Sequence, residues 1–183
     1  MAQLDEFSLA IGSPAPPFDL PGVDGARHRL DDFANDPQLL VVFWCNHCPY
    51  VQAWEGRMIE LAKEYRSRGL ATVLINANDP VAYPDDRPER MAERARSKGY
   101  PFPYLWDESQ EVARAYGALV TPHPMLFGPN RRLLYQGAID DRHDAPARVA
   151  QHYLREAVES AISGRTIEPA TRPVLGCSVK WRS

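Results

Sequence analysis

Two unbroken apolar runs, residues 39–44 and 71–76, dominate the hydrophobic pattern of the first half of the chain. Continuous apolar sequence of this length is typical of strands that are buried on both faces. Between the runs, apolar residues recur at spacings of three and four from Val51 to Tyr65, which predicts a helix ending at Gly69. A strand–helix–strand order predicts two parallel strands joined by a right-handed crossover.

The elements predicted around this unit are shorter. The proline-rich residues 12–20 suit an edge or an extended lead-in, and a turn is expected at residues 23–26. Further along, the pattern predicts helices at 85–98, 109–116 (capped by Ser109) and 147–163, a short strand at 103–106, and a hairpin of 125–127 with 133–135. Residues 165–183 show no periodicity. We therefore predict one α/β domain, residues 1–164, followed by a C-terminal tail, residues 165–183.

Composition and charge narrow the class of protein. A chain of 183 residues suits one compact domain, and a net charge of −3 gives no electrostatic reason to expect nucleic acid or an anionic membrane as a partner. Residues 1–6 lack the features of a secretion signal, and no apolar stretch approaches transmembrane length, so we expect a cytoplasmic protein. Charges of both signs alternate at helical spacing, which predicts a solvated helix face: Asp86, Arg87, Glu89, Arg90, Glu93, Arg94 and Lys98.

The chemistry-bearing motif is Cys45-Asn46-His47-Cys48, which follows the first apolar run and opens the predicted helix, with Pro49 in its first turn. Residues three apart lie on one helical face, so the two sulfurs can bond to each other. The helix N-terminus favours a thiolate, which is the nucleophilic form of cysteine. The alternative is half of a zinc site with His47 as an extra ligand. Zinc usually needs a second ligand pair, and the sequence has no second CxxC or HxxxH, so we expect no metal.

The chain resembles the thioredoxin superfamily, in the branch of TlpA-like and AhpC/TSA-like redoxins. The matching pieces lie between residues 12 and 163: Gly12-x-Pro14-Ala15-Pro16-x-Phe18-x-Leu20, Phe43-Trp44-Cys45-x-x-Cys48, Thr121-Pro122 and Met125-Leu126-Phe127. The ending Gly176-Cys177-Ser178-Val179-Lys180-Trp181 resembles that of a subgroup of thioredoxin-like proteins. The resemblance implies a thioredoxin-like fold, with a central mixed β-sheet flanked by helices, an N-terminal extension and the C-terminal tail.

The resemblance also implies roles for single residues. Cys45 is the expected attacking thiolate, nearer the helix N-terminus and solvent, and Cys48 resolves the mixed disulfide. Trp44, Asn46 and His47 are expected to tune the site; His47 stabilises the thiolate and raises the redox potential above that of thioredoxin, unless it is only a cap or solvated.

The Thr121-Pro122 step is the expected cis-proline facing the CxxC, with Pro124 as the competing candidate and an ordinary trans turn as the alternative. In the superfamily this step exposes the backbone of Thr121 for pairing with a bound substrate strand.

Several other residues carry weaker expectations. Trp44 and Trp54 either shape a substrate surface or belong to the core. His123 is expected in an exposed loop, with an approach to the active site as the alternative. Asp79 follows the second strand, where a turn-forming role is favoured over proton transfer. Cys177 is either a third redox residue or a small buried hydrophobe.

Two departures from the family pattern matter. The strand before Cys45 lacks the buried carboxylate of thioredoxins, so proton transfer at Cys48 needs another group or water. Peroxiredoxins carry Pro-x-x-x-Thr-x-x-Cys, whereas Gln38 and Val42 occupy the corresponding positions here, which weakens the peroxidase alternative.

These observations predict a thiol–disulfide oxidoreductase that acts by dithiol/disulfide exchange, without a metal or organic cofactor. Its partners would be a protein or small-molecule disulfide or dithiol and an external thiol electron donor or acceptor. The alternatives are a thiol peroxidase using Cys45, and a binding module whose CxxC switches a partner interface.

Overall fold

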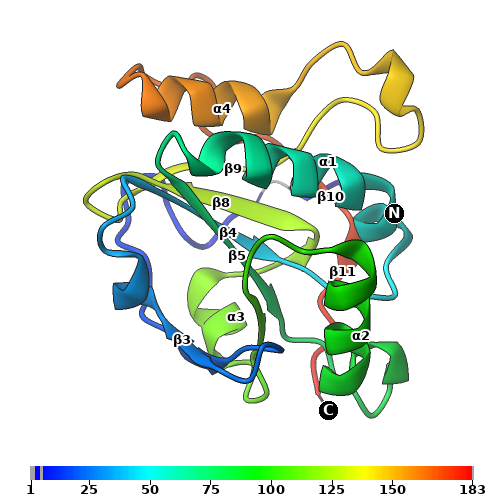
Figure 1. Cartoon of the computed structure of the whole chain (residues 1–183). Helices are drawn as coiled ribbons and strands as arrows, with labels where there is room; N and C mark the ends of the chain where they lie inside the picture. The colour runs from blue at the N-terminus through cyan, green and yellow to red at the C-terminus, as the bar shows by residue number, and fades with distance from the viewer. Residues whose placement is uncertain (1–2, 5, 183) are drawn as a thin grey trace.

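The computed structural model describes residues 3–4 and 6–182, so residues 1, 2, 5 and 183 of the predicted N-terminal segment and tail lie outside the described residues. A five-stranded mixed sheet forms its centre, in the order β6-β5-β4-β8-β9 (Figure 1). The strands are β4 (Gln38–Phe43), β5 (Leu70–Asn76), β6 (Tyr104–Trp106), β8 (His123–Phe127) and β9 (Leu133–Gln136). β4, β5 and β6 are parallel, whereas β8 is antiparallel to both β4 and β9. The predicted parallel unit and the hairpin are confirmed.

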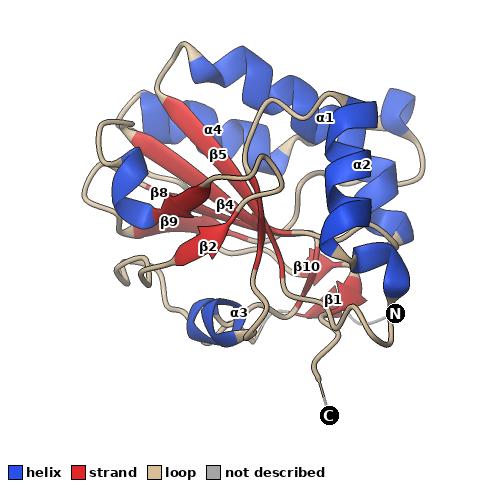
Figure 2. Cartoon of the chain, turned by 60° about the horizontal axis from the view of Figure 1, so that its bottom comes forward, coloured by secondary structure: helices blue, strands red, loops and turns tan. Residues whose placement is uncertain are grey.

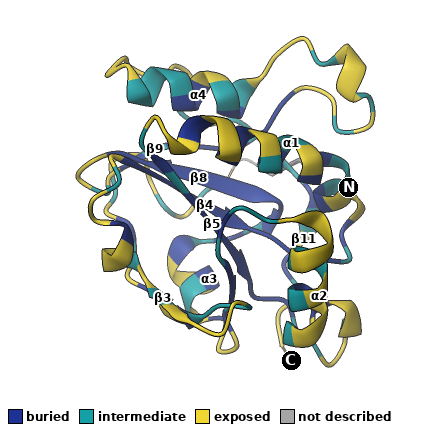
Figure 3. Ribbon diagram, in the orientation of Figure 1, coloured by how far each residue is buried: buried dark blue, intermediate teal, exposed yellow. Residues whose placement is uncertain are grey.

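Helices cover both faces of this sheet: α1 (Pro49–Arg66) and α4 (Tyr153–Ile162) lie on one side, and α3 (Glu111–Tyr116) lies on the other (Figure 1). Successive side chains of a strand point to opposite faces. Leu40 and Val42 of β4 therefore pack in the cluster beneath α1 and α4, whereas Val41 and Phe43 pack with Tyr116 of α3. Burial on both faces is the reason that the run is apolar throughout, and Figure 3 shows the sheet buried.

Helix α1 matches its prediction closely. Pro49 is its first residue, where a missing N–H costs little, and Cys48 is its N-cap. The buried face contains the five residues that the periodicity predicts, together with Glu55 and Ala62. The five are Val51, Trp54, Met58, Leu61 and Tyr65. Because β4 leads directly into this helix, the CxxC lies at the carboxyl edge of the sheet.

Short antiparallel pairs surround the central sheet. β2 (Asp19–Pro21) and β3 (Arg27–Arg29) flank the predicted turn. The tail returns to the domain and contributes β10 (Val174–Leu175), paired with β1 (Gln3–Leu4), and β11 (Cys177–Ser178), paired with β7 (Val120–Thr121). Figure 2 shows the β1–β10 pair apart from the central sheet. The division at residue 164 stays a prediction.

Three predicted helix boundaries are wrong in detail. Residues Pro84–Asp86 form a separate 3-10 turn, because Arg87 is extended, and α2 (Pro88–Lys98) begins after it. Helix α4 begins at Tyr153, since residues 147–152 hold only the end of a second 3-10 turn, Pro146–Arg148. The remaining 3-10 turn is Leu30–Phe33.

The third boundary is that of α3. The residue at its N-cap position is Gln110, at a φ of 65°, but Ser109 still caps the helix as predicted, since its hydroxyl accepts a hydrogen bond from the Glu111 N–H at 3.2 Å. No helix among the described residues is both long enough and apolar enough to cross a membrane.

Candidate active site

The two cysteines of the CxxC lie where β4 gives way to α1, and both side chains are fully buried. The expectation that Cys45 lies nearer the helix N-terminus and solvent is wrong, because Cys48 is the N-cap of α1 and Cys45 precedes it by three residues. None of Cys45, Cys48 and Cys177 is part of a disulfide in this structure.

The Thr121-Pro122 step faces the cysteines, as predicted. Its peptide bond is cis, whereas Pro124 belongs to strand β8. The Thr121 hydroxyl lies 3.0 Å from the Cys45 sulfur, and its carbonyl oxygen lies 3.2 Å from the Cys48 sulfur. Thr121 therefore touches both sulfurs of the pair, one through its side chain and one through its backbone.

The Cys48 sulfur has a second neighbour, the sulfur of Cys177, at 2.8 Å. Cys177 lies in the tail, 129 residues further along the chain. The structure therefore brings together all the sequence-predicted cysteines, the tail cysteine included.

The electrostatics of the pair place its negative charge on Cys48. A hydrogen bond from the Cys45 thiol, helped by those from the Cys177 thiol and the Val51 N–H, lowers the pKa of Cys48 to about 5 despite burial. The pKa of Cys45 is raised, mainly by burial and then by Cys48. Two sulfurs that share a proton titrate as a unit, and the two pKa shifts favour Cys48 over Cys45 as the sulfur that carries the negative charge of the reduced pair.

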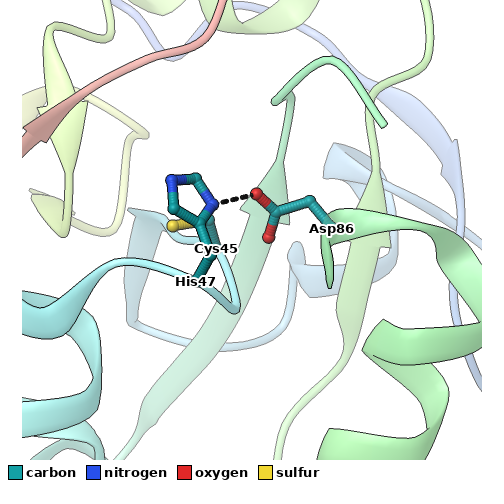
Figure 4. A group of neighbouring side chains, drawn as sticks. All are labelled: Cys45, His47 and Asp86. Atoms are coloured by element: carbon teal, nitrogen blue, oxygen red, sulfur yellow. Dashed lines mark hydrogen bonds and ion pairs between the residues drawn. The ribbon is translucent and has the colours of Figure 1, made fainter. Parts of the chain in front are cut away.

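Asp86 is the site residue that sequence reasoning missed. The charge pattern predicts a solvated helix face for it, yet its carboxylate is fully buried in the 3-10 turn before α2. It accepts hydrogen bonds from the Asn46 backbone N–H at 2.6 Å and from the Asn78 amide at 2.9 Å. Its Oδ2 lies 2.5 Å from Nδ1 of His47 (Figure 4).

The pairing with Asp86 gives His47 a defined role. Although burial raises the pKa of a carboxyl, the hydrogen bonds from His47, Asn78 and Asn46 hold the pKa of Asp86 below its usual range. The same carboxylate raises the pKa of His47, mainly through their hydrogen bond, and the nearby Cys48 also favours the imidazolium. The half-buried ring stacks on Tyr83, with 4.9 Å between centroids. His47 is therefore held against Asp86, with its pKa raised, beside Cys48, and the alternatives of a cap or a solvated side chain are wrong.

The remaining predicted residues lie in supporting positions. Trp44 and Trp54 are core side chains, whose indole N–H groups donate to Tyr100 and Asp140. The expectation of an exposed loop for His123 is wrong, since it lies fully buried in β8 and burial lowers its pKa to about 3. Asp79 accepts a hydrogen bond from the backbone of Val81, the turn-forming role that was favoured.

Among the described residues, Cys45, His47 and Asp86 form one cluster whose donor atoms lie within 4.8 Å of one another, close enough to hold a metal ion. The donors are committed elsewhere, however. His47 and Asp86 bond each other, Asp86 also accepts from Asn46 and Asn78, and Cys45 contacts Thr121. This arrangement fits a thiolate site better than a cation site.

The low pKa of Cys48 predicts a thiolate at neutral pH. When the pH of the reduced protein is raised, we expect its thiolate absorbance at 240 nm to increase in a first step with a midpoint near pH 5. Below that pH Cys48 is protonated and does not absorb as a thiolate. An ordinary cysteine would titrate near ~8.5. The Cys48→Ser variant is the control and should lose this step. A first midpoint at the ordinary value in the wild-type protein would contradict the charge arrangement described above.

Comparison with known proteins identifies the family and the fold of the chain. The sequence pattern of the AhpC/TSA family matches residues 11–136. The thiol-disulfide oxidoreductase ResA of Geobacillus thermodenitrificans (strain NG80-2) is 30% identical over 129 residues, which cover 70% of each chain.

Solved structures extend the likeness to nearly the whole chain. A hypothetical protein from Sinorhizobium meliloti 1021 is 39% identical, with a TM-score of 0.91 over 96% of this chain and 97% of that one. A thiol:disulfide interchange protein of the thioredoxin family from Chlorobium tepidum TLS shares the fold at 19% identity, with a TM-score of 0.65 over 84% and 98% of the two chains. The predicted thioredoxin-like α/β fold is therefore confirmed, and the chain belongs to the AhpC/TSA family.

Proposed function

We propose that this protein is a thiol–disulfide oxidoreductase that works by dithiol/disulfide exchange between Cys45 and Cys48. The single observation that carries the proposal is a hydrogen-bonded pair of free cysteines at the start of α1, one of them held as a thiolate by its surroundings. A thiolate is the form that attacks disulfides. Relatives named thiol-disulfide oxidoreductase support the reaction class.

In the proposed exchange, Cys45 passes its proton to the Cys48 thiolate and then attacks a substrate disulfide. One sulfur of the substrate leaves as a thiolate, and the other forms a mixed disulfide with Cys45. Cys48, now a thiol, can donate to the Thr121 carbonyl oxygen at 3.2 Å. It then attacks the Cys45 sulfur and gives its proton to the departing substrate sulfur, which frees the second substrate thiol and leaves a Cys45–Cys48 disulfide. The substrate gains two electrons and the protein loses two; the reverse steps oxidise a dithiol.

His47 and Asp86 replace the carboxylate that the strand before Cys45 lacks. The His47 ring favours negative charge on Cys48, because the two groups attract each other, whereas the Asp86 carboxylate disfavours negative charge on Cys45. Asp86 keeps His47 charged and fixed through the bond between Oδ2 and Nδ1. The site therefore has a charge pair for the thiolate chemistry, in which His47 comes from the CxxC and the carboxylate of Asp86 comes from the segment after β5 instead of from β4.

The peroxidase alternative has less support in the site. Val42 lies buried within β4, and Gln38, also buried, donates its side-chain amide to the Ala161 carbonyl, so neither offers a hydroxyl to a peroxide at Cys45. Stopped-flow mixing with hydroperoxide tests this alternative, since only fast sulfenic acid formation on Cys45 would favour it. A redox-switched binding module would show no disulfide turnover while oxidation changed its affinity for a partner.

The proposal is tested by reduction of insulin and of a small aromatic disulfide, with dithiothreitol as the electron donor. We expect turnover above the rate of dithiothreitol alone, and none from the Cys45→Ser/Cys48→Ser variant. Equal rates with and without wild-type protein, for both substrates and for oxidation of a dithiol peptide, would contradict the proposal.

The cytoplasmic location and the identity of the electron donor stay predictions.

We expect His47 to make the pair more oxidising. An imidazolium that stabilises the thiolate stabilises the reduced form, so the potential should lie above the ~−270 mV of thioredoxin. The His47→Gln variant should shift it downward by about 30 mV for each ~1.4 kcal/mol of lost thiolate stabilisation. Titration against glutathione measures both values. The exposed His152→Gln is the matched control; an unchanged potential in His47→Gln, or a wild-type value of about −270 mV or lower, would refute this expectation.

A further inference from the structure

The C-terminal tail occupies the place that a substrate strand was expected to take. Strand β11 pairs antiparallel with β7, with Cys177 opposite Thr121 and Ser178 opposite Val120. Thr121 is the residue before the cis-proline and touches both active-site sulfurs. The tail therefore lies on the active site as an extended strand that carries a cysteine of its own (Figure 1).

Close approach of the tail depends on Gly176. A Cβ built on this glycine would lie 2.4 Å from the Thr121 carbonyl oxygen and 2.9 Å from its carbonyl carbon, distances that a side chain does not tolerate. A glycine here allows the two backbones to come together. The next residue, Cys177, is thereby held against Thr121.

Hydrogen bonds after Cys177 hold the tail in this position. The Val179 N–H donates to the Leu119 carbonyl at 3.2 Å, and the Lys180 N–H donates to the Asn78 side chain at 2.9 Å. The Lys180 carbonyl in turn accepts from the Gln110 amide at 2.9 Å. Asn78 also donates to Asp86, so the tail and the His47–Asp86 pair share a partner. The tail is thus docked on both sides of Cys177.

Docking brings a third sulfur to the pair from the solvent side. The Cys177 sulfur lies 2.8 Å from the Cys48 sulfur, and Cys177 is half-buried whereas Cys45 and Cys48 are fully buried. A merely structural cysteine needs no sulfur partner. Here the contact falls on the cysteine that forms the second half of the exchange.

We propose that Cys177 is a third redox-active cysteine, which β11 presents to Cys48 in the position of a substrate strand so that an internal Cys48–Cys177 disulfide forms. This inference rests on the proposed function. The Cys177 thiolate attacks Cys48 in the Cys45–Cys48 disulfide, a new sulfur–sulfur bond forms and the old one breaks. Cys177 is oxidised, Cys45 is reduced, and the proton that Cys177 loses is regained by Cys45. The step needs no outside oxidant, and it frees Cys45 while the protein remains oxidised.

The charge arrangement fits this order of events. In the reduced site, burial and the hydrogen bond with Cys48 raise the pKa of Cys177 to about 12, so Cys177 remains a thiol. Once Cys48 is in a disulfide, it carries no negative charge, so its contribution to the raised pKa of Cys177 disappears. Cys177 therefore becomes a better nucleophile only after the CxxC is oxidised.

The experiment uses the full-length Cys45→Ser variant, in which the Cys45–Cys48 disulfide cannot form. The reduced, folded variant is treated with oxidised glutathione, quenched with acid, alkylated and digested without reduction. We expect a peptide that links Cys48 to Cys177 and the loss of both free thiols. The control Cys45→Ser/Cys177→Ser should stop at the mixed disulfide of Cys48 with glutathione. That same mixed disulfide as the final product in Cys45→Ser, with Cys177 alkylated, would overturn the proposal.

A second variant tests whether the docked strand delivers Cys177. Adding Gly176→Ala to Cys45→Ser keeps the tether but separates the tail from Thr121. A flexible tether alone gives millimolar effective concentrations, so the rate of internal disulfide formation should fall about tenfold or more. An unchanged rate would overturn the role of β11. The proposed function is tested separately with the Cys177→Ser variant, which retains the CxxC. If this variant forms a Cys45–Cys48 disulfide while it reduces a substrate, exchange at that pair is supported whether or not Cys177 takes part.

Discussion

Replacing Cys48 by serine is expected to end disulfide turnover and to leave the substrate covalently attached to Cys45. Serine occupies the N-cap of α1 without strain, because hydroxyl side chains are favoured there, so the fold should be retained. Its hydroxyl cannot break a mixed disulfide, whereas the Cys45 thiol is still present to form one. Turnover should fall to the rate of the assay thiol alone, and intact mass measurement should show one substrate adduct that dithiothreitol removes.

The matched variant is Cys45→Ser, which should lose turnover to the same extent without accumulating an adduct. The opposite result is an adduct on Cys48 in the Cys45→Ser variant and no adduct on Cys45 in the Cys48→Ser variant. It would show that Cys48, not Cys45, attacks the substrate. Such a result has a structural rationale, since Cys48 is the sulfur that carries the negative charge at rest. Cys48→Ser/Cys177→Ser completes the set, because it removes the third sulfur that could release a trapped substrate.

The central unit of the fold was predictable because its signals are local and strong. β4 is apolar at every position from Leu39 to Phe43, and α1 repeats its apolar residues every three or four positions. Together they place the CxxC at the edge of the sheet without knowledge of the rest of the chain. The choice of Pro122 over Pro124 depended on the family resemblance, since residue pattern alone does not specify a cis bond.

Asp86 could not be found in the same way, because its burial is a tertiary effect. Asp85 and Asp86 are identical neighbours in a charged segment, yet only Asp86 turns inward, towards His47 and the amide of Asn78. One signal was present: Pro88 suits the first turn of a helix, which separates residues 84–87 as a turn of their own. That boundary would have removed Asp86 from the helix face, although it would not have identified its partners.

The position of Cys177 shows a similar limit. Chain length allows the tail to reach the CxxC, but reach does not specify contact. The contact results from pairing between β11 and β7 and from the backbone approach at Gly176, neither of which has a periodic signature in segments of two residues. The Gly176-Cys177 dipeptide was the available signal, since a glycine beside a cysteine favours close backbone approach.

Replacing Asp86 by asparagine is expected to destabilise the reduced protein by about 3 kcal/mol or more, the usual cost of removing one partner of a buried ion pair. In the variant an NH2 group, which cannot accept a hydrogen bond, replaces one carboxylate oxygen. At least one of the three donors therefore loses its acceptor: the Asn46 backbone N–H, the Asn78 amide or the His47 ring. The pKa of His47 should fall towards its ordinary value, because Asp86 is the main cause of its rise. Urea unfolding measures the stability, and NMR titration of the ring protons measures the pKa.

The pH dependence gives the prediction a second readout. The lowered pKa of Asp86 means that its stabilising contribution is present above its ordinary value of 3.8 and is lost as pH falls through the lowered pKa. The raised pKa of His47 acts in the opposite sense: its contribution is complete below the ordinary value of 6.5 and is lost as pH rises through the raised pKa. The difference in the free energy of unfolding between the wild type and Asp86→Asn should therefore be largest between pH 3.8 and pH 6.5. Asp85→Asn, one residue away and exposed, should show neither the loss nor the pH profile; if both variants unfold alike, the buried charge pair does not organise this site.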